Sequence, residues 1–158
     1  MRWLALLALL LASTATLAED TKPFVRGSQQ AIVSAHQGKP FILAVWSLDC
    51  THCIDDLKLL GELQAKHRNL AVVLVATDTP AQGGKIEAAR KQYRLQRAES
   101  WVFADSYAER LRFEIDPEWY GELPRTYFFD AAGGVSAFSG KLERRAVEQW
   151  IKGNAGHG

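Results

Sequence analysis

The sequence predicts an α/β domain in which a mixed central sheet is covered by helices on both faces. Two observations lead to this class. Short apolar runs alternate with segments of helical periodicity along most of the chain, and near its end two β-rich runs flank a turn before a last helix. With 158 residues, of which 47% are hydrophobic and 23% charged, the chain has the size and composition of one globular domain.

The first half of the alternation consists of two strands and the helix between them. Residues 41–46 (FILAVW) form a short apolar run after a Gly-Lys-Pro turn, which predicts a buried central strand. Residues 51–67 carry leucine and isoleucine among charged residues at near-helical spacing, which predicts a helix. Residues 70–76 (LAVVLVA) predict a second buried strand, and the Thr-Asp-Thr-Pro sequence that follows predicts a turn.

The second half continues the alternation and closes with a hairpin. We expect a helix at 85–93, a short strand at 101–104 and one or two helical turns at 106–113. Two β-rich runs, 126–129 and 135–138, flank the turn sequence Asp-Ala-Ala-Gly-Gly and predict a β-hairpin. A last helix has an apolar face that consists of Leu142, Ala146, Val147, Trp150 and Ile151.

The first 18 residues predict a secretory signal. They contain a basic residue, an apolar run over 4–12 and a series of small residues that ends at Ala18. The alternative is a membrane anchor, but the run is shorter than the roughly 20 residues that span a bilayer. We therefore expect a signal peptide at 1–18, one domain at 19–153 and a flexible tail at 154–158.

The charge of the mature chain is close to zero. Cleavage after Ala18 removes one of the 19 basic residues and leaves 18 beside 18 acidic residues. This balance gives no support for a nucleic-acid partner or for binding to an anionic membrane. We expect no stable membrane insertion of the mature chain.

Both cysteines of the chain, Cys50 and Cys53, lie within the stretch WSLDCTHC, where the first strand leads into a helix. A disulfide that closes so short a loop restrains little of the unfolded chain, so a purely structural bridge is disfavoured. Closely spaced thiols are typical of a redox pair, in which one thiolate attacks and the other resolves the mixed disulfide. We expect Cys50 to be the nucleophile, because the helix start favours a thiolate, and Cys53 to be the more covered, resolving thiol.

Two neighbours are predicted to tune Cys50 in opposite directions. His52 lies between the cysteines, where its imidazole would stabilise a Cys50 thiolate and make the disulfide more oxidising. Asp49 carries a negative charge that would disfavour the thiolate. In the alternative for each residue, the side chain is exposed to solvent and has no tuning role. The direction of the redox reaction stays open at this point.

The order of these motifs resembles the thioredoxin fold, and specifically the exported TlpA-like thiol:disulfide oxidoreductases. The resemblance rests on the CxxC at a strand-to-helix junction, on the Val-Trp-Ser segment around Trp46, and on the Gly-x-x-Pro-x-Thr block at 121–126 before the hairpin. It covers residues 24–152. It implies an active-site cis-proline at Pro124, and it implies that Leu123, Pro124 and Trp46 contact the substrate.

The resemblance also implies an enzyme that acts in the periplasm, or is otherwise exported, and reduces disulfides of client proteins. Its thiols would be re-reduced by a membrane thiol relay, since no flavin or nicotinamide motif is visible and no cofactor is expected. One departure is Ala44, which stands where thioredoxin has a buried acid. A base for Cys53 must then be water or another group such as Glu122.

Three alternatives remain for the function, of which a degenerate binding module that keeps the fold for protein contacts is disfavoured by the intact CxxC. The same fold can act as an oxidase that donates disulfides to its clients. The two thiols, with or without His52, could instead hold Cu(I), an ion that thiolates bind well. The other histidines, His36, His67 and His157, are not spaced to complete a zinc site with the CxxC, and we expect no resident metal.

Overall fold

The computed structural model describes residues 21–154. The predicted signal segment and residues 155–158, including His157, lie outside this part. Its strands and helices, in chain order, are β1 (Thr21–Phe24), α1 (Ser28–Ala35), β2 (Phe41–Trp46), α2 (Thr51–Lys66), β3 (Ala71–Ala76), a 3₁₀ turn (Pro80–Gln82), α3 (Gly83–Gln92), β4 (Glu99–Phe103), α4 (Ala108–Ile115), β5 (Arg125–Phe129), β6 (Val135–Ser139) and α5 (Arg144–Asn154). Within this range no helix has the length and apolar character needed to cross a membrane.

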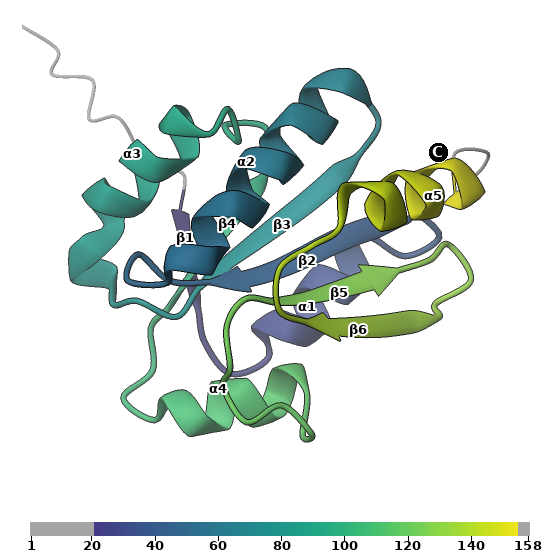
Figure 1. Cartoon of the computed structure of the whole chain (residues 1–158). Helices are drawn as coiled ribbons and strands as arrows, with labels where there is room; N and C mark the ends of the chain where they lie inside the picture. Colours follow the sequence, from purple (N-terminus) through teal and green to yellow (C-terminus); the bar gives the residue numbers. More distant parts are fainter. Residues whose placement is uncertain (1–20, 155–158) are drawn as a thin grey trace, which may run out of the picture.

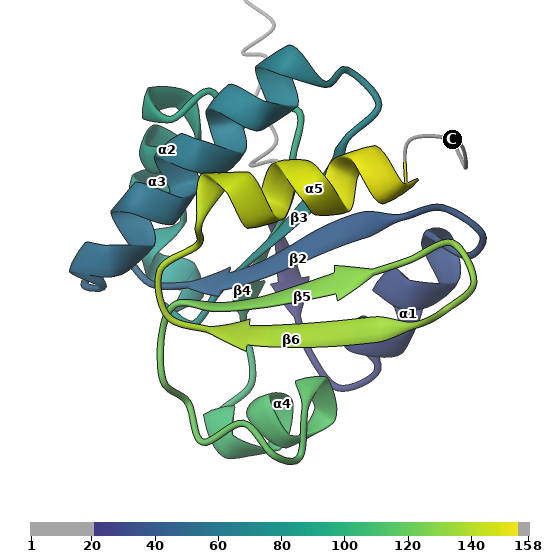
Figure 2. The ribbon, with the colours of Figure 1, turned by 45° about the vertical axis from the view of Figure 1, so that its right-hand side comes forward.

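The strands form one six-stranded sheet in the order β1-β4-β3-β2-β5-β6. The four strands from β1 to β2 run parallel, and β5 and β6 are antiparallel to their neighbours. Helices α2, α3 and α5 cover one face, and α1 and α4 lie on the other (Figures 1 and 2). The predicted mixed sheet with helices on both faces is therefore confirmed.

The alternation of side chains along each strand divides the core into two clusters. Ile42, Ala44 and Trp46 of β2 point into the cluster under α2, α3 and α5. Phe41, Leu43 and Val45 point into the cluster on the side of α1 and α4. Because both faces are covered, all six residues of β2 are buried, which explains why this strand appears in the sequence as an uninterrupted apolar run.

The structure adds two elements at the start of the domain that the sequence did not predict. β1 is a strand of four residues that contains Pro23; within residues 21–154 it lies at the edge of the sheet and pairs with β4 alone. In α1, Ile32 is the one apolar residue that is fully buried, so the helical pattern is weak. At the other end, α5 continues through Asn154, one residue past the predicted end of the domain.

A close backbone approach between α2 and the end of α3 generates a prediction. A Cβ atom at Gly61 would overlap the carbonyl oxygen of Tyr93, whose backbone cannot shift freely. We expect Gly61→Ala to lower the free energy of unfolding by about 1–3 kcal/mol through overpacking, as measured by urea denaturation with the disulfide intact.

The matched control is Gly84→Ala, in the first turn of α3, where an added Cβ has no neighbour within 4 Å. This change should leave stability unaltered or raise it by up to about 1 kcal/mol. An equal loss of unfolding free energy in Gly61→Ala and Gly84→Ala would show that the close approach of Tyr93 is not the reason for a glycine at position 61.

Candidate active site: a disulfide where β2 leads into α2

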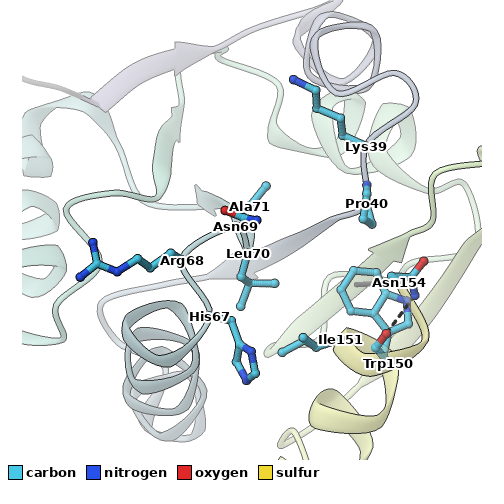
Figure 3. Close-up of a pocket in the computed structure, with 10 residues that line it drawn as sticks. All are labelled: Lys39, Pro40, His67, Arg68, Asn69, Leu70, Ala71, Trp150, Ile151 and Asn154. Carbon is cyan, nitrogen blue, oxygen red and sulfur yellow. Dashed lines mark hydrogen bonds between the residues drawn. The ribbon is translucent and has the colours of Figure 1, made fainter. Parts of the chain in front are cut away.

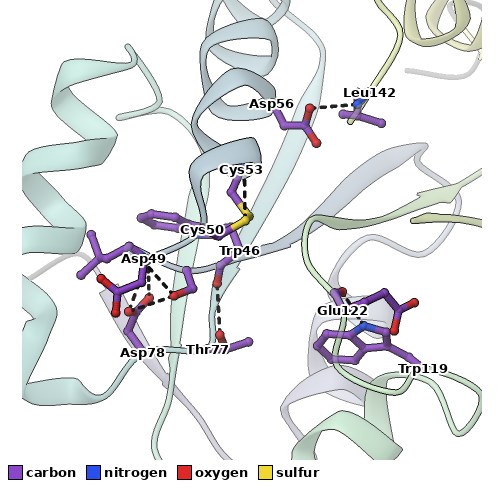
Figure 4. Close-up of a disulfide and its surroundings, with 12 residues drawn as sticks. Trp46, Asp49, Cys50, Cys53, Asp56, Thr77, Asp78, Trp119, Glu122 and Leu142 are labelled. Carbon is purple, nitrogen blue, oxygen red and sulfur yellow. Dashed lines mark hydrogen bonds between the residues drawn. A yellow bond between two sulfur atoms is a disulfide. The ribbon is translucent and has the colours of Figure 1, made fainter. Parts of the chain in front are cut away.

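Cys50 and Cys53 are joined by a disulfide at the start of α2, with their Cα atoms 5.3 Å apart (Figure 4). Cys50 is the N-cap of the helix. The backbone N–H of Cys53, a donor of the first helical turn, lies 3.2 Å from the Cys50 Sγ and 3.1 Å from the Cys50 carbonyl oxygen, so the two acceptors share it. In the reduced protein, the same donor is placed to stabilise a Cys50 thiolate.

The two cysteines differ in exposure. Cys53 is fully buried in the cluster under α2, whereas Cys50 is partly exposed at the border of that cluster. A molecule in solvent can therefore reach Cys50 and not Cys53. Cys53 is the more covered of the two cysteines, and its role as the resolving thiol stays a prediction.

His52 and Asp49, the two predicted tuning residues, both lie exposed beside the disulfide. The backbone N–H of Asp49 donates to the Ser47 hydroxyl at 3.3 Å. Within residues 21–154, no group of three or more His, Cys, Asp or Glu side chains is arranged to hold a metal ion. The tuning roles of His52 and Asp49 stay predictions.

The segment before Cys50 is fixed by a buried carboxylate that the sequence did not single out. Asp78, just after β3, is 8% exposed. Its two oxygens accept from the Leu48 N–H at 3.1 and 3.3 Å, and one of them accepts from the Ser47 hydroxyl at 3.3 Å (Figure 4). Burial raises the pKa of Asp78 above its ordinary value, and these hydrogen bonds oppose the rise only in part.

Trp46 does not fit its predicted role in substrate contact. It is the last residue of β2, and its side chain is only 2% exposed. The alternation of the strand directs it into the core cluster under α2, together with Cys53. Trp46 therefore lies beneath the disulfide as a packing residue and does not face a client.

The Leu123–Pro124 peptide bond is cis, as the resemblance implied. Leu123 is partly buried and packs against both core clusters, one of which Cys50 also borders. Glu122 is exposed, and its carbonyl oxygen accepts from the indole N–H of the buried Trp119 at 2.8 Å. Tyr120, which lies between Trp119 and Glu122 in the sequence, is 94% exposed, so this loop presents an aromatic ring to solvent.

Arg125, next to the cis-proline, anchors the loop to the sheet. Its guanidinium donates to Asp116 at 2.6 Å, to Ser139 of β6 at 2.6 Å and to the Tyr127 hydroxyl at 3.1 Å. Burial raises the pKa of Tyr127 to about 12, so its hydroxyl stays protonated and donates to Asp116 at 3.2 Å. These contacts hold both ends of the loop in place.

A hollow of about 490 Å³ lies at the opposite end of the sheet (Figure 3). Its lining includes Lys39 and Pro40, which precede β2, whereas Cys50 follows the other end of that strand. The side chains of Lys39 and Arg68 extend in different directions and do not converge on one point. The hollow is separate from the disulfide and lacks the converging polar groups typical of a ligand site.

Comparisons with known proteins identify the fold. No protein-family model matches the sequence, and no curated protein matches it. Among solved structures, a secreted disulfide oxidoreductase from Mycobacterium tuberculosis, homologous to DsbE of E. coli, matches with a TM-score of 0.61 and 20% identity over 76% of this chain and 85% of its own. A thiol:disulfide interchange protein of the thioredoxin family from Chlorobium tepidum matches with a TM-score of 0.60 and 19% identity over 77% and 83%. This chain has the thioredoxin fold.

A third structure, StoA from Bacillus subtilis, has the same fold, with a TM-score of 0.52 and 18% identity over 73% of this chain and 84% of its own. At such identities the likeness establishes the fold and leaves the activity to be argued from the site. The predicted thioredoxin fold is confirmed.

Asp56 is a second buried acidic residue that, like Asp78, was not predicted from the sequence. Asp56 lies one turn after Cys53 on α2 and is 3% exposed. One carboxylate oxygen accepts from the Leu142 N–H at 2.9 Å, and the other has no partner among residues 21–154 (Figure 4). Burial raises the pKa of Asp56 from 3.8 to about 6. Its spacing of three residues from Cys53 was the available signal, since such residues are neighbours on a helix surface.

Glu122, which sequence analysis named as an alternative base for Cys53, is engaged elsewhere. Its side chain is 48% exposed, and it accepts from the Ser139 hydroxyl at 2.7 Å. Asp56, by contrast, is buried and lies one turn after Cys53 on the same helix.

The raised pKa of Asp56 predicts how stability depends on pH. The folded chain binds this proton more tightly than the unfolded chain, so the contribution of Asp56 to stability is present at low pH and is lost as the pH rises from 3.8 through about 6. Relative to Asp56→Asn, which does not titrate, the natural protein should lose about 3 kcal/mol of unfolding free energy across this range.

The measurement is urea denaturation of the oxidised proteins at several pH values from below 4 to above 7. Asp55→Asn is the control, because Asp55 lies next to Asp56 but pairs with Lys141 at the surface. The control should follow the trend of the natural protein. If the unfolding free energies of the natural protein and of Asp56→Asn changed with pH in parallel, the raised pKa of Asp56 would be contradicted.

Proposed function

We propose that the chain is an exported thiol:disulfide oxidoreductase that reduces disulfides of client proteins through Cys50 and Cys53. The proposal rests mainly on the difference in exposure between the two bonded cysteines, since Cys50 is partly exposed at a helix start and Cys53 is fully buried. That asymmetry suits a reaction in which one sulfur meets the client and the second acts only afterwards. The thioredoxin fold supports the same function.

The first step joins the protein to its client. The thiolate of Cys50 attacks one sulfur of the client disulfide, so that a bond forms between Cys50 and the client while the bond within the client breaks. The other client sulfur leaves as a thiolate and takes a proton from water. The helix start and the N–H of Cys53 stabilise the attacking thiolate.

The second step releases the client. Cys53, as a thiolate, attacks the Sγ of Cys50, the mixed disulfide breaks, and the second client sulfur leaves as a thiolate. The Cys50–Cys53 disulfide of the present structure is the product, and two electrons have passed to the client. Asp56 would accept the proton of Cys53, because it is buried one turn away and has an unpartnered oxygen in the described part of the chain.

The oxidising alternative uses the same steps in reverse, so the reduction potential of the couple separates the two directions. A value near that of thioredoxin, about −270 mV, would identify a reductant, and a value near about −120 mV would identify a disulfide donor. We favour the reductant, because Asp49 and Asp78 place two carboxylates near Cys50 and a carboxylate opposes a thiolate.

Export and the electron donor form the remaining part of the proposal. Residues 1–18 have the pattern of a secretory signal, and one of the similar structures is that of a secreted enzyme. After each cycle the disulfide must be reduced again, and for an exported protein a membrane thiol relay would supply the electrons. The resemblance to the TlpA-like group supports this donor.

The function is tested on the mature chain beginning at Glu19, with insulin as the client and dithiothreitol as the reductant. We expect the natural protein to accelerate insulin reduction and Cys50→Ser to be no faster than dithiothreitol alone. Cys53→Ser should accumulate a mixed disulfide with the client on non-reducing gels, because the resolving thiol is absent.

The double variant Cys50→Ser/Cys53→Ser serves as the control and should trap nothing. A natural protein without activity, or a Cys53→Ser variant that traps no client, would reject the proposed function.

The role of Asp56 is tested by the resolution step alone. When reduced protein meets excess glutathione disulfide, Asp56→Asn should resolve its mixed disulfide about a hundredfold more slowly near pH 7, because the base for Cys53 is lost. Acid quenching and mass spectrometry measure the decay of the mixed disulfide.

The rate of the Asp56→Asn variant should keep rising with pH, since Cys53 then has to lose its proton to solvent. Asp55→Asn, at the surface of the same helix, should behave like the natural protein. Equal rates and equal pH profiles in all three proteins would exclude Asp56 as the base.

A further inference from the structure

Asp78 carries a buried negative charge beside the segment that leads to Cys50. Its carboxylate contacts Ser47 and Leu48, and the N–H of Cys50 itself bonds to the Ser47 carbonyl oxygen at 3.2 Å. Among residues 21–154, no ion pair joins Asp78 to a lysine, arginine or histidine. The charge is thus held by neutral donors and is not cancelled by a cation.

A second carboxylate lies on the exposed side of the same segment. Asp49 directly precedes Cys50, and its negative charge contributes to the raised pKa of Asp78. The two carboxylates therefore act on each other across the turn from Ser47 to Cys50, next to the disulfide (Figure 4). A thiolate on Cys50 would be a third negative charge in this region.

We propose that Asp78 is a positioning residue for Cys50 that also sets the redox direction of the protein. It fixes the turn before the cysteine through Ser47 and Leu48, and its uncancelled charge opposes the Cys50 thiolate. The reduced form is thereby disfavoured relative to the disulfide, so the protein gives electrons to clients more readily. This inference rests on the proposed function and assigns the residue that selects its direction.

Burial makes Asp78 more effective in this role than its exposed neighbours. The charges of Asp49 and His52 are surrounded by solvent and are screened by salt over a short distance. Asp78 is 8% exposed, and a charge in such surroundings acts more strongly and is screened much less. The helix start favours the thiolate, and Asp78 is the buried group that counters it.

If Asp78 has a purely structural role, a different result is expected, and the substitution Asp78→Asn separates the structural role from the role of its charge. Asp78→Asn retains an oxygen that can accept from the Leu48 N–H, but it removes the charge. If Asp78 serves only as a hydrogen-bond acceptor, this variant should resemble the natural protein. If its charge matters, the acidity of Cys50 must change while the fold is kept.

The experiment titrates the Cys50 thiol of the reduced mature protein by its ultraviolet thiolate absorbance. We expect Asp78→Asn to raise the acid dissociation constant of Cys50 about tenfold, at both low and high salt. At a pH above the thiol pKa, the equilibrium with glutathione should shift about tenfold towards the reduced protein, which corresponds to about 30 mV for two electrons. Asp78→Glu, which retains the charge, should restore most of the natural value.

Asp49→Asn is the matched control. Its effect on the Cys50 thiol should be smaller and should vanish at high salt. If Asp78→Asn does not fold, as judged by circular dichroism, Asp78→Ser provides a second neutral side chain that can form hydrogen bonds. An unchanged Cys50 dissociation constant in a folded neutral variant, or a shift that high salt abolishes, would overturn the inference.

The titration needs no client, so its outcome is independent of insulin reduction. An inactive natural protein with a normal response to Asp78→Asn would reject the proposed function alone. An active natural protein with no response would reject only the role of Asp78.

Discussion

The fixed position of the end of β2 is the constraint on which the site depends. β2 pairs with β3 on one side and β5 on the other, and both of its faces are covered, so its last residue has little freedom. α2 begins a few residues later and packs down on the same sheet through Cys53 and Leu57. Cys50, the N-cap of α2, lies between β2 and α2, and these two rigid elements fix the position of its sulfur.

Two buried carboxylates then divide the control of the two sulfurs between them. Asp56 is on α2, one turn after Cys53, and its raised pKa lets it exist in both protonation states near neutral pH. Asp78 follows β3 and accepts from the N–H of Leu48, in the segment that leads to Cys50, and the proposed cycle gives it no proton transfer. In the proposed cycle Asp56 thus moves a proton, while Asp78 supplies a fixed charge. Position 44, where thioredoxin has a buried acid, holds Ala44, which is part of the core.

The sequence predicted the elements whose pattern is strong and missed those whose role depends on three-dimensional orientation. β2 and β3 were predictable because strands covered on both faces need continuous apolar runs. The hairpin was predictable because a tight turn needs particular residues. Asp55 and Asp56 are neighbours in sequence, and which of them is buried depends on which face of α2 packs against the core. Trp46 was assigned to the substrate surface by analogy, although the alternation along β2 directs it into the core.

In the proposed function, the cis-proline loop is the part of the site where client recognition can vary. The anchors of the loop, Arg125 and Asp116, are tied to β5 and to each other, so the backbone around Leu123 is held on the side of the sheet that Cys50 borders. Glu122 joins these anchors, because its carboxylate accepts from the Ser139 hydroxyl that Arg125 also contacts. Tyr120, by contrast, is 94% exposed and faces solvent. In the proposed function, a change at Tyr120 would therefore alter the surface that the loop offers to a client without breaking the contacts that hold the loop.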